Sequence, residues 1–219
     1  MSAAIEVKGL CFAYGKREIL NDIHLTVQRG ETLVLTGDSG CGKTTLCRIL
    51  CGIIPHAVPG TVRGDVLLLG ENIAEKTLAE CALKIGMVFQ DADQQLICTT
   101  VEDELAFAPE NLCVPAEEIR CRVDEMLRRF RMEKMRLSNP SRLSGGQKKL
   151  LTIAATLMLQ PPILVLDEPM NALDAESREL VQQAVRQLQQ EGTTLVVIEH
   201  DPALYPENAR VVRLQEGRL

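Results

Sequence analysis

The sequence predicts an α/β fold with a mainly parallel sheet, an N-terminal antiparallel β subdomain and an inserted helical subdomain. From residue 32 onward, short apolar segments of strand type alternate with helical patterns, which is typical of a parallel sheet covered on both faces. Before that, residues 4–31 read as strands and turns. From about residue 91 to 142, charged residues and helix formers dominate. We therefore expect one domain over 1–219, in which 1–90 and 143–219 form the α/β core and 91–142 the inserted helical subdomain.

The composition is that of an ordinary globular protein and narrows the classes of function. Of 219 residues, 46% are hydrophobic and 25% charged, and the net charge of -6 argues against a general nucleic-acid surface. The eight cysteines include no CxxC pair, so we expect reduced thiols in a cytosolic protein. Cys47 and Cys51 share a helix face, which suits either a metal site or two buried thiols, and we favour burial. No apolar run reaches 18 residues and no signal pattern opens the chain, so we expect neither a membrane span nor export.

The N-terminal elements follow from periodicity and glycine. Strands are expected within 4–15 and within 19–31, where polar and apolar residues alternate from Asp22 to Gln28. Residues 32–37, "TLVLTG", form a continuous apolar segment that ends in glycine, and a helix is expected from Lys43 to Ile54. A further strand is expected over 64–73, which has glycine near both ends.

The C-terminal elements complete the alternation. Glu and Arg alternate at helical spacing over 116–131, and an apolar, buried helix is expected from Ser144 to Gln160, before Pro161 and Pro162. Residues 163–167, "ILVLD", read as a buried strand. An amphipathic helix follows from Asp174 to Glu191, with Leu180, Ala184 and Leu188 in register and Gly192 after it. Strands over 193–200 and 209–214 close the pattern.

A glycine-rich segment between the strand at 32–37 and the next helix matches the P-loop pattern G-x4-G-K-[ST]. In that context the glycines let backbone N–H groups surround a β-phosphate, and the fold becomes a P-loop NTPase core. Lys43 would reach the β- and γ-phosphates, Thr44 would hold Mg²⁺, and Thr45 would touch the α-phosphate. A glycine-rich turn without a ligand is the alternative. The predicted nucleotide-binding residues here are Gly37, Asp38, Ser39, Gly40, Cys41, Gly42, Lys43, Thr44 and Thr45.

Three polar residues lie at the carboxyl ends of two predicted buried strands. Asp167 ends "ILVLD", at the sheet edge where open α/β sheets bind ligands, and is predicted to hold Mg²⁺ through water. Glu168 comes next and is placed to accept a proton from an attacking water. His200 ends "LVVIEH" and is predicted to point toward the γ-phosphate from the same edge. A solvated turn and an ordinary surface histidine are the alternatives.

A second glycine cradle opens the helix near residue 144. Ser144, Gly145 and Gly146 precede an apolar helix, so free backbone N–H groups at its start can face an anion. One P-loop already accounts for one nucleotide. The residues alone therefore leave open what the second cradle binds.

With "LSGGQ" at 143–147, the sequence resembles the ATPase domain of ATP-binding-cassette (ABC) transporters. The resemblance covers residues 5–219 and rests on "GDSGCGKTT", "VFQ", "LSGGQ", "LVLDEP", "NALD" and "IEHD" in the family's order. It implies ATP and Mg²⁺ as cofactors and ATP hydrolysis coupled to transport. By position, it implies that Tyr14 stacks on adenine and that Gln90 senses Mg²⁺ and the attacking water. It also makes Ser144, Gly145 and Gly146 the signature loop, Asp174 the D-loop aspartate and His200 the switch histidine.

The resemblance also implies partners. In this family two ATPase domains pair head to tail, and the signature loop of one closes over the γ-phosphate held by the P-loop of the other. The segment "FQDADQQLICTTVEDELAFAPENLCVP" is similar to the energy-coupling-factor branch, which imports vitamins and transition-metal ions. The implied partners are a second ATPase chain, identical or a sister, a transmembrane coupling protein that residues 91–95 would face, and a substrate-binding membrane protein. The implied place is the cytoplasmic face of a prokaryotic cell membrane.

Several positions depart from the family's pattern. Lys149 and Leu150 stand where Gln-Arg is usual, Met170 and Asn171 replace Thr-Ser, and Cys41 replaces Ser or Ala. The sequence ends where energy-coupling ATPases usually continue into a helical region that helps to hold the dimer. The rival functions are an ABC-superfamily ATPase acting on nucleic acid or ribosomes, and a P-loop kinase or plain nucleotide-binding module. Long coiled-coil insertions or two cassettes in one chain would favour the nucleic-acid ATPase, and neither is present.

Overall fold

The computed structural model describes residues 2–219, which form two compact units. Unit 1 comprises residues 1–87, 161–168 and 186–219, and unit 2 comprises residues 88–160 and 169–185. These limits differ from the core and insertion limits expected from composition. The predicted division into 1–90, 91–142 and 143–219 stays a prediction.

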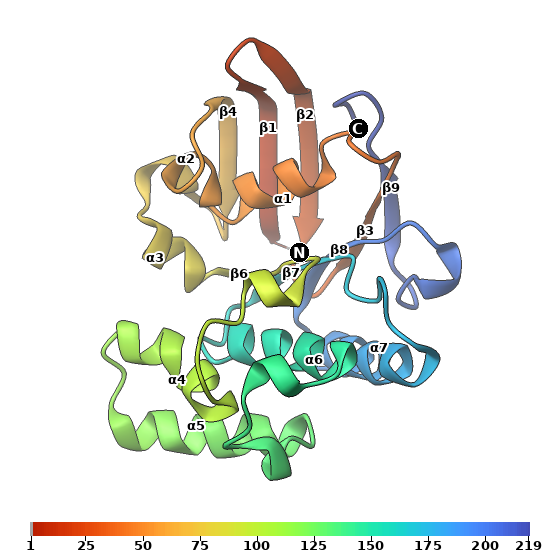
Figure 1. Ribbon diagram of the computed structural model, residues 1–219. Coiled ribbons are helices and arrows are strands. Elements are labelled where there is room, and N and C mark those ends of the chain that lie inside the picture. Colours follow the sequence, from red (N-terminus) through yellow and green to blue (C-terminus); the bar gives the residue numbers. More distant parts are fainter. Residues whose placement is uncertain (1) are drawn as a thin grey trace. The chain divides into compact units, whose positions relative to one another are not determined.

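Unit 1 contains an antiparallel sheet in the order β2-β1-β4-β5 (Figure 1). Strands β1 and β2 have twelve residues each, and their apolar side chains, including Ile5, Leu10 and Leu20, are buried. The long hairpin explains the alternation in the sequence, because inward and outward side chains alternate along a strand. The bounds are β1 Ala3–Tyr14, β2 Arg17–Gln28, β4 Thr61–Leu68 and β5 Glu71–Asn72.

The second sheet has the order β6-β7-β8-β3-β9. Its pairs β7/β8, β3/β8 and β3/β9 are all parallel, and every residue of β7 and β8 is buried. This arrangement confirms the predicted α/β fold, and it brings the carboxyl ends of β3, β7 and β8 to one edge. The bounds are β3 Thr32–Thr36, β6 Ile85–Val88, β7 Ile163–Asp167, β8 Thr194–Ile198 and β9 Arg210–Arg213.

The helix after β3 is shorter than its apolar pattern suggests. It was expected to reach Ile54, but α1 ends at Leu50 and a separate short helix, α2, begins at Ile53. The physical reason is Gly52, whose φ of 72° is left-handed and ends a helix. Apart from α7, which is described below, the helical segments with residues in unit 1 have these bounds: α1 Lys43–Leu50, α2 Ile53–His56, η1 Ile73–Glu75, α3 Leu78–Ala82 and η5 Pro202–Leu204.

Unit 2 is helical. Helix α5 buries Ile119, Val123, Met126 and Leu127, the apolar positions between its alternating charges. Acidic residues occupy its first turn and arginines its last, which complements the helix dipole. The bounds are η2 Ala92–Gln94, α4 Val101–Asn111, α5 Ala116–Arg129, η3 Glu133–Met135, η4 Pro140–Arg142 and α6 Gly145–Leu157.

Two further helices bury side chains that differ in part from those predicted. Helix α6 is buried on most sides, as predicted, but its buried residues include the charged Lys149. Helix α7, Ala175–Gln190, begins in unit 2 and ends in unit 1. Its buried apolar residues are Val181, Val185 and Leu188, so the apolar face is rotated from the predicted line through Leu180 and Ala184.

The structure also bears on the two neighbouring cysteines and on membrane-spanning helices. Cys47 and Cys51 are buried, and in the part of the chain that the structure describes no group of three His, Cys, Asp or Glu side chains is arranged to hold a metal ion. Within residues 2–219, none of the helices has the length and apolar character that crossing a bilayer requires.

Candidate functional site

The P-loop of unit 1 connects the end of β3 to the start of α1. Gly42 occupies the N-cap position of α1 in a left-handed conformation, and no side chain caps the first turn. The N–H groups of that turn are therefore available to an anion. A Cβ atom at position 37 would lie 2.1 Å from the carbonyl oxygen of Leu214, so only glycine fits there. The loop thus has the backbone of a phosphate cradle.

Lys43 lies across this loop. Its ammonium Nζ donates to the carbonyl oxygens of Gly37 and Asp38, both at 2.9 Å, and the residue is only 6% exposed. The Cys41 Sγ lies 3.8 Å from the same nitrogen. A buried ammonium needs acceptors, and here the loop's own carbonyls supply them. Asp38, Ser39 and Gly40 are exposed at the tip.

Thr44 and Asp167 meet although 123 residues separate them in the sequence. The Thr44 hydroxyl donates to Asp167 Oδ2 at 3.0 Å, and Asp167 is 2% exposed at the end of β7. A hydroxyl and a carboxylate side by side are the hard oxygen donors that Mg²⁺ prefers. This donor set therefore fits a Mg²⁺ ion.

Glu168 and His200 form a second pair at the same sheet edge. His200 Nε2 lies 2.9 Å from Glu168 Oε1, a contact in which the imidazole N–H donates to the carboxylate. Glu168 has a left-handed φ of 44°, rare for a residue with a side chain, and its backbone N–H donates to the carbonyl of Ile198 in β8. The strained turn directs the Glu168 side chain toward His200.

Sequence reasoning missed Glu199. Its Oε1 accepts from the backbone N–H of His200 at 2.8 Å and of Asp201 at 3.4 Å, and the residue is 6% exposed. The carboxylate therefore fixes the turn that carries the imidazole. The available signal was a carboxylate directly before the histidine at a strand end.

Tyr14 ends β1 and is half-buried. Its ring packs edge-on against Phe12, with ring centroids 4.6 Å apart and planes at 88°. The contact orients the Tyr14 ring and favours no particular ligand. The proposed stacking on adenine stays a prediction.

The second cradle lies in unit 2. Ser144 caps α6: its hydroxyl accepts from the backbone N–H of Gln147, whose side chain in turn accepts from the N–H of Ser144. A Cβ atom at position 146 would lie 2.4 Å from Ser177 Cβ, whereas one at 145 would make an ordinary 3.5 Å contact with Leu173. Gly146 therefore allows α6 to approach α7, and Gly145 leaves the turn open.

Asp174 contacts the same serine. The backbone N–H and the hydroxyl of Ser177 donate to its carboxylate at 2.8 and 3.0 Å. These hydrogen bonds hold the pKa of Asp174 below its usual range. Ser177 thus links the predicted D-loop aspartate to the predicted signature loop within unit 2.

The predicted site residues therefore form two groups, one in each unit. Unit 1 brings together the P-loop, the Thr44–Asp167 pair and the Glu168–His200 pair. Unit 2 brings Asp174 and Gly146 to Ser177, and it holds Gln90, which is exposed. Sequence reasoning gave no contact for Lys149, yet its ammonium donates to the carbonyl of Gln90 at 2.7 Å.

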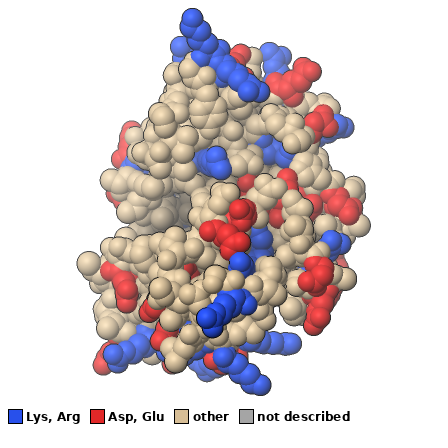
Figure 2. Space-filling model, viewed as in Figure 1, with Lys and Arg blue, Asp and Glu red and all other residues tan. Residues whose placement is uncertain are grey.

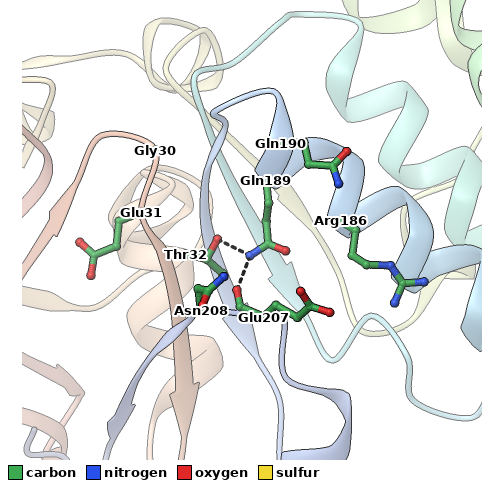
Figure 3. A pocket seen from close by; sticks show the side chains of 8 residues that line it. All are labelled: Gly30, Glu31, Thr32, Arg186, Gln189, Gln190, Glu207 and Asn208. Atoms are coloured by element: carbon green, nitrogen blue, oxygen red, sulfur yellow. Dashed lines mark hydrogen bonds between the residues drawn. The ribbon is translucent and has the colours of Figure 1, made fainter.

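A polar cavity of unit 1 lies away from the P-loop. It has a volume of about 450 Å³ and contains Thr32, the first residue of β3, whereas the P-loop follows that strand's other end. Gln189 donates to the Thr32 hydroxyl and to the carbonyl of Glu207, as Figure 3 shows. No predicted site residue lines this cavity.

Comparison with known proteins agrees with these features. The sequence profile of the family described as ABC transporter matches residues 20–171. An ABC transporter ATP-binding protein of Pyrococcus abyssi is 42% identical over 98% of this chain and 78% of its own length. The energy-coupling factor transporter ATP-binding protein EcfA1 of Streptococcus thermophilus is 36% identical over the same shares.

A longer relative and a solved structure extend the comparison. The chain is 39% identical to an ABC transporter ATP-binding protein of Methanosarcina mazei, but it spans only 38% of that protein. The structure of cbiO1 from Clostridium perfringens, described as part of the ABC transporter complex cbiONQ, superimposes with a TM-score of 0.86. It is 32% identical in sequence, and the alignment covers 100% of this chain and 87% of cbiO1. The resemblance inferred from the motifs is confirmed. The chain belongs to the ABC transporter family and forms an ATP-hydrolysing domain.

Proposed function

We propose that this chain is the ATP-hydrolysing subunit of an energy-coupling-factor importer, in which ATP-driven closure of an ATPase dimer drives uptake of a vitamin or a metal ion. The observation that carries the ATPase part is the pair of contacts Thr44–Asp167 and Glu168–His200 beside the P-loop. The likeness to EcfA1 and cbiO1 supports the branch.

The residues of the P-loop bind the triphosphate. Backbone N–H groups from Gly37 to Thr45 surround the phosphates, Lys43 neutralises their charge, and Tyr14 covers the adenine. Thr44 and Asp167 would hold Mg²⁺, and the family pattern assigns Gln90 to sensing the same ion. The ion, when bound, neutralises charge on the phosphate oxygens.

Glu168 is the general base. Its carboxylate accepts the proton of the attacking water, and His200 orients that carboxylate through the 2.9 Å contact. Glu199 in turn holds the backbone of His200. The strained turn at Glu168 places the base at the carboxyl edge of the sheet, beside the P-loop.

The second cradle acts on the nucleotide of a partner. Ser144, Gly145 and Gly146 present the open N-terminus of α6 to the γ-phosphate held by the P-loop of a second ATPase chain, identical or a sister. Ser177, which packs against Gly146, also donates to Asp174 and so links this aspartate to the same turn. Two chains paired head to tail then form two composite sites.

Bound nucleotide should protect Cys41 from alkylation. Cys41 is half-buried in the P-loop, so an alkylating reagent reaches it when the loop is empty and is excluded when nucleotide covers the loop. Cys47 and Cys51 should label slowly in either state, because burial raises the pKa of both thiols. Mass spectrometry of the labelled peptides measures each rate, and the exposed Cys113 and Cys121 serve as controls. Equal labelling of Cys41 with and without ATP would contradict nucleotide binding at this loop.

The proposed membrane partners are those of the energy-coupling-factor branch. Residues 91–95 face a transmembrane coupling protein, a substrate-binding membrane protein supplies the cargo, and the chain works on the cytoplasmic face of the membrane. On the face shown in Figure 2, described basic and acidic side chains are interspersed rather than gathered into one basic surface. That distribution gives no support to a nucleic-acid partner.

Purification of the tagged chain from membranes of the cells that naturally make it tests the importer proposal. Two integral membrane proteins and a bound vitamin or metal ion should co-purify with the chain. Co-purification of ribosomal proteins, or ATPase activity stimulated by DNA, would instead identify a nucleic-acid ATPase.

A further inference from the structure

A buried lysine on helix α6 holds the loop that follows β6. The loop spans residues 89–95 and contains Gln90, and like α6 it belongs to unit 2. Lys149 is 3% exposed, and its ammonium donates to two consecutive carbonyls of this loop, Phe89 O at 2.8 Å and Gln90 O at 2.7 Å. An ammonium removed from water is costly unless it is hydrogen-bonded, so this geometry strongly favours one loop conformation.

Further described contacts join the same loop to the same helix or stiffen the loop itself. The Gln95 side chain accepts from the N–H of Phe89 at 3.1 Å and donates to the hydroxyl of Thr156 at 3.3 Å. Lys148 pairs with Asp93 at 2.6 Å; the Lys148 side chain is 17% exposed and that of Asp93 is 66% exposed. An ion pair that is open to solvent on one side contributes less than hydrogen bonds from a buried ammonium, whose loss leaves buried acceptors unsatisfied.

Helix α6 begins at the predicted signature turn, Ser144–Gly146, which also belongs to unit 2. Ser144 caps it, and Lys149 follows five residues later, on the next turn. Because a helix is stiff over this length, the turn at 144–146 and the Lys149 ammonium move together. The 89–95 loop and the signature turn are therefore both tied to the first turns of one helix.

We propose that Lys149 is a positioning residue, which fixes the main chain at Gln90 relative to the signature turn at Ser144–Gly146. It occupies a position where the family usually has a different residue, and its contacts give that departure a physical role. Lys149 has this role only if Gln90 and the signature turn act on nucleotide as proposed above, so the inference rests on the proposed function.

Replacement of Lys149 should slow turnover without weakening nucleotide binding. Lys149→Met keeps the length of the side chain and removes the donors, and we expect kcat for ATP hydrolysis to fall about tenfold, because small misplacements of a catalytic group are costly. KM for ATP should change less than about twofold, since the P-loop is intact, and Lys149→Arg should recover part of kcat. The matched control Lys148→Met removes the pair with Asp93 and should change kcat less than about twofold.

A double-mutant cycle with Gln90 distinguishes positioning from a general loss of stability. If Lys149 acts through Gln90, Lys149→Met should add less than about a twofold loss in a Gln90→Ala background. Losses that multiply would overturn the proposal, as would a rise in KM with kcat unchanged. If Lys149→Met does not fold, Lys149→Gln, which keeps N–H donors in its amide group but loses the charge, is measured against the same predictions.

Amide hydrogen exchange tests the contact without turnover. Lys149→Met should speed exchange across residues 89–95, and Lys148→Met should not. Equal exchange in the two variants would overturn the role of Lys149 even if the chain is an active ATPase. Conversely, if Glu168→Gln hydrolyses ATP normally, the proposed catalytic mechanism fails, while the exchange result still reports on the loop.

Discussion

Glu168→Gln is expected to bind ATP and to lose roughly 10²–10⁴-fold in hydrolysis, the usual contribution of a general base. The amide has the shape of the carboxylate but does not accept a proton from water. Its oxygen still accepts from His200, and the backbone contact to Ile198 is unaffected, so the strained turn should persist. Steady-state ATPase rates and equilibrium binding of ATP measure the two effects separately.

The contrasting variant is Lys43→Ala. It removes the ammonium that the P-loop carbonyls hold, so nucleotide binding itself should weaken. Glu168→Gln should also accumulate an ATP-bound dimer, because closure no longer ends in cleavage, and gel filtration with ATP detects it. Near-normal turnover in Glu168→Gln would remove Glu168 from the mechanism.

The sequence predicted the parts of the site that depend on local chemistry. Strand, glycine loop and helix at 32–50 form as expected, because each part has its own short-range signal. The cap at Ser144 was equally predictable, since the glycines mark a helix start and Gln147 completes a capping box. Asp167 and Thr44 meet because a parallel sheet brings its carboxyl ends to one edge.

Contacts between distant segments of polar residues were not predictable. In the sequence, Lys149 stood out only as a departure from the family's pattern. Its acceptors are carbonyls about sixty residues earlier, which have no side-chain signal. Strand β6 is only four residues long and was overlooked between two polar stretches. The apolar face of α7 was misplaced because Leu180, Val181 and Ala184, Val185 are adjacent pairs, and only packing decides which member is buried.

Activity should return when two inactive variants of this chain are combined in one dimer. Ser144→Arg fills the second cradle with bulk, and Lys43→Ala disables the P-loop. Position 144 is exposed, so arginine fits there, whereas any side chain at 146 would collide with Ser177. As a homodimer, each variant has two defective sites and should be nearly inactive.

The geometry of the mixed dimer decides the outcome. If the signature acts on the partner's nucleotide, the intact P-loop of the Ser144→Arg chain meets the intact signature of the Lys43→Ala chain, and one site is whole. The other site carries both defects. If the signature acted within its own chain, every site would keep one defect. One whole site supports up to about half the activity of a normal dimer, and less if the two sites are coupled.

The most direct test is the ATPase rate measured across mixing ratios of these two variants, after native mass spectrometry has shown that mixed dimers form. The predicted result is a rate that rises from near zero at either end to a maximum at equal amounts, with one ATP bound per mixed dimer. A rate that stays near zero at every ratio, although mixed dimers form and hold ATP, would contradict a signature that acts on the partner's nucleotide.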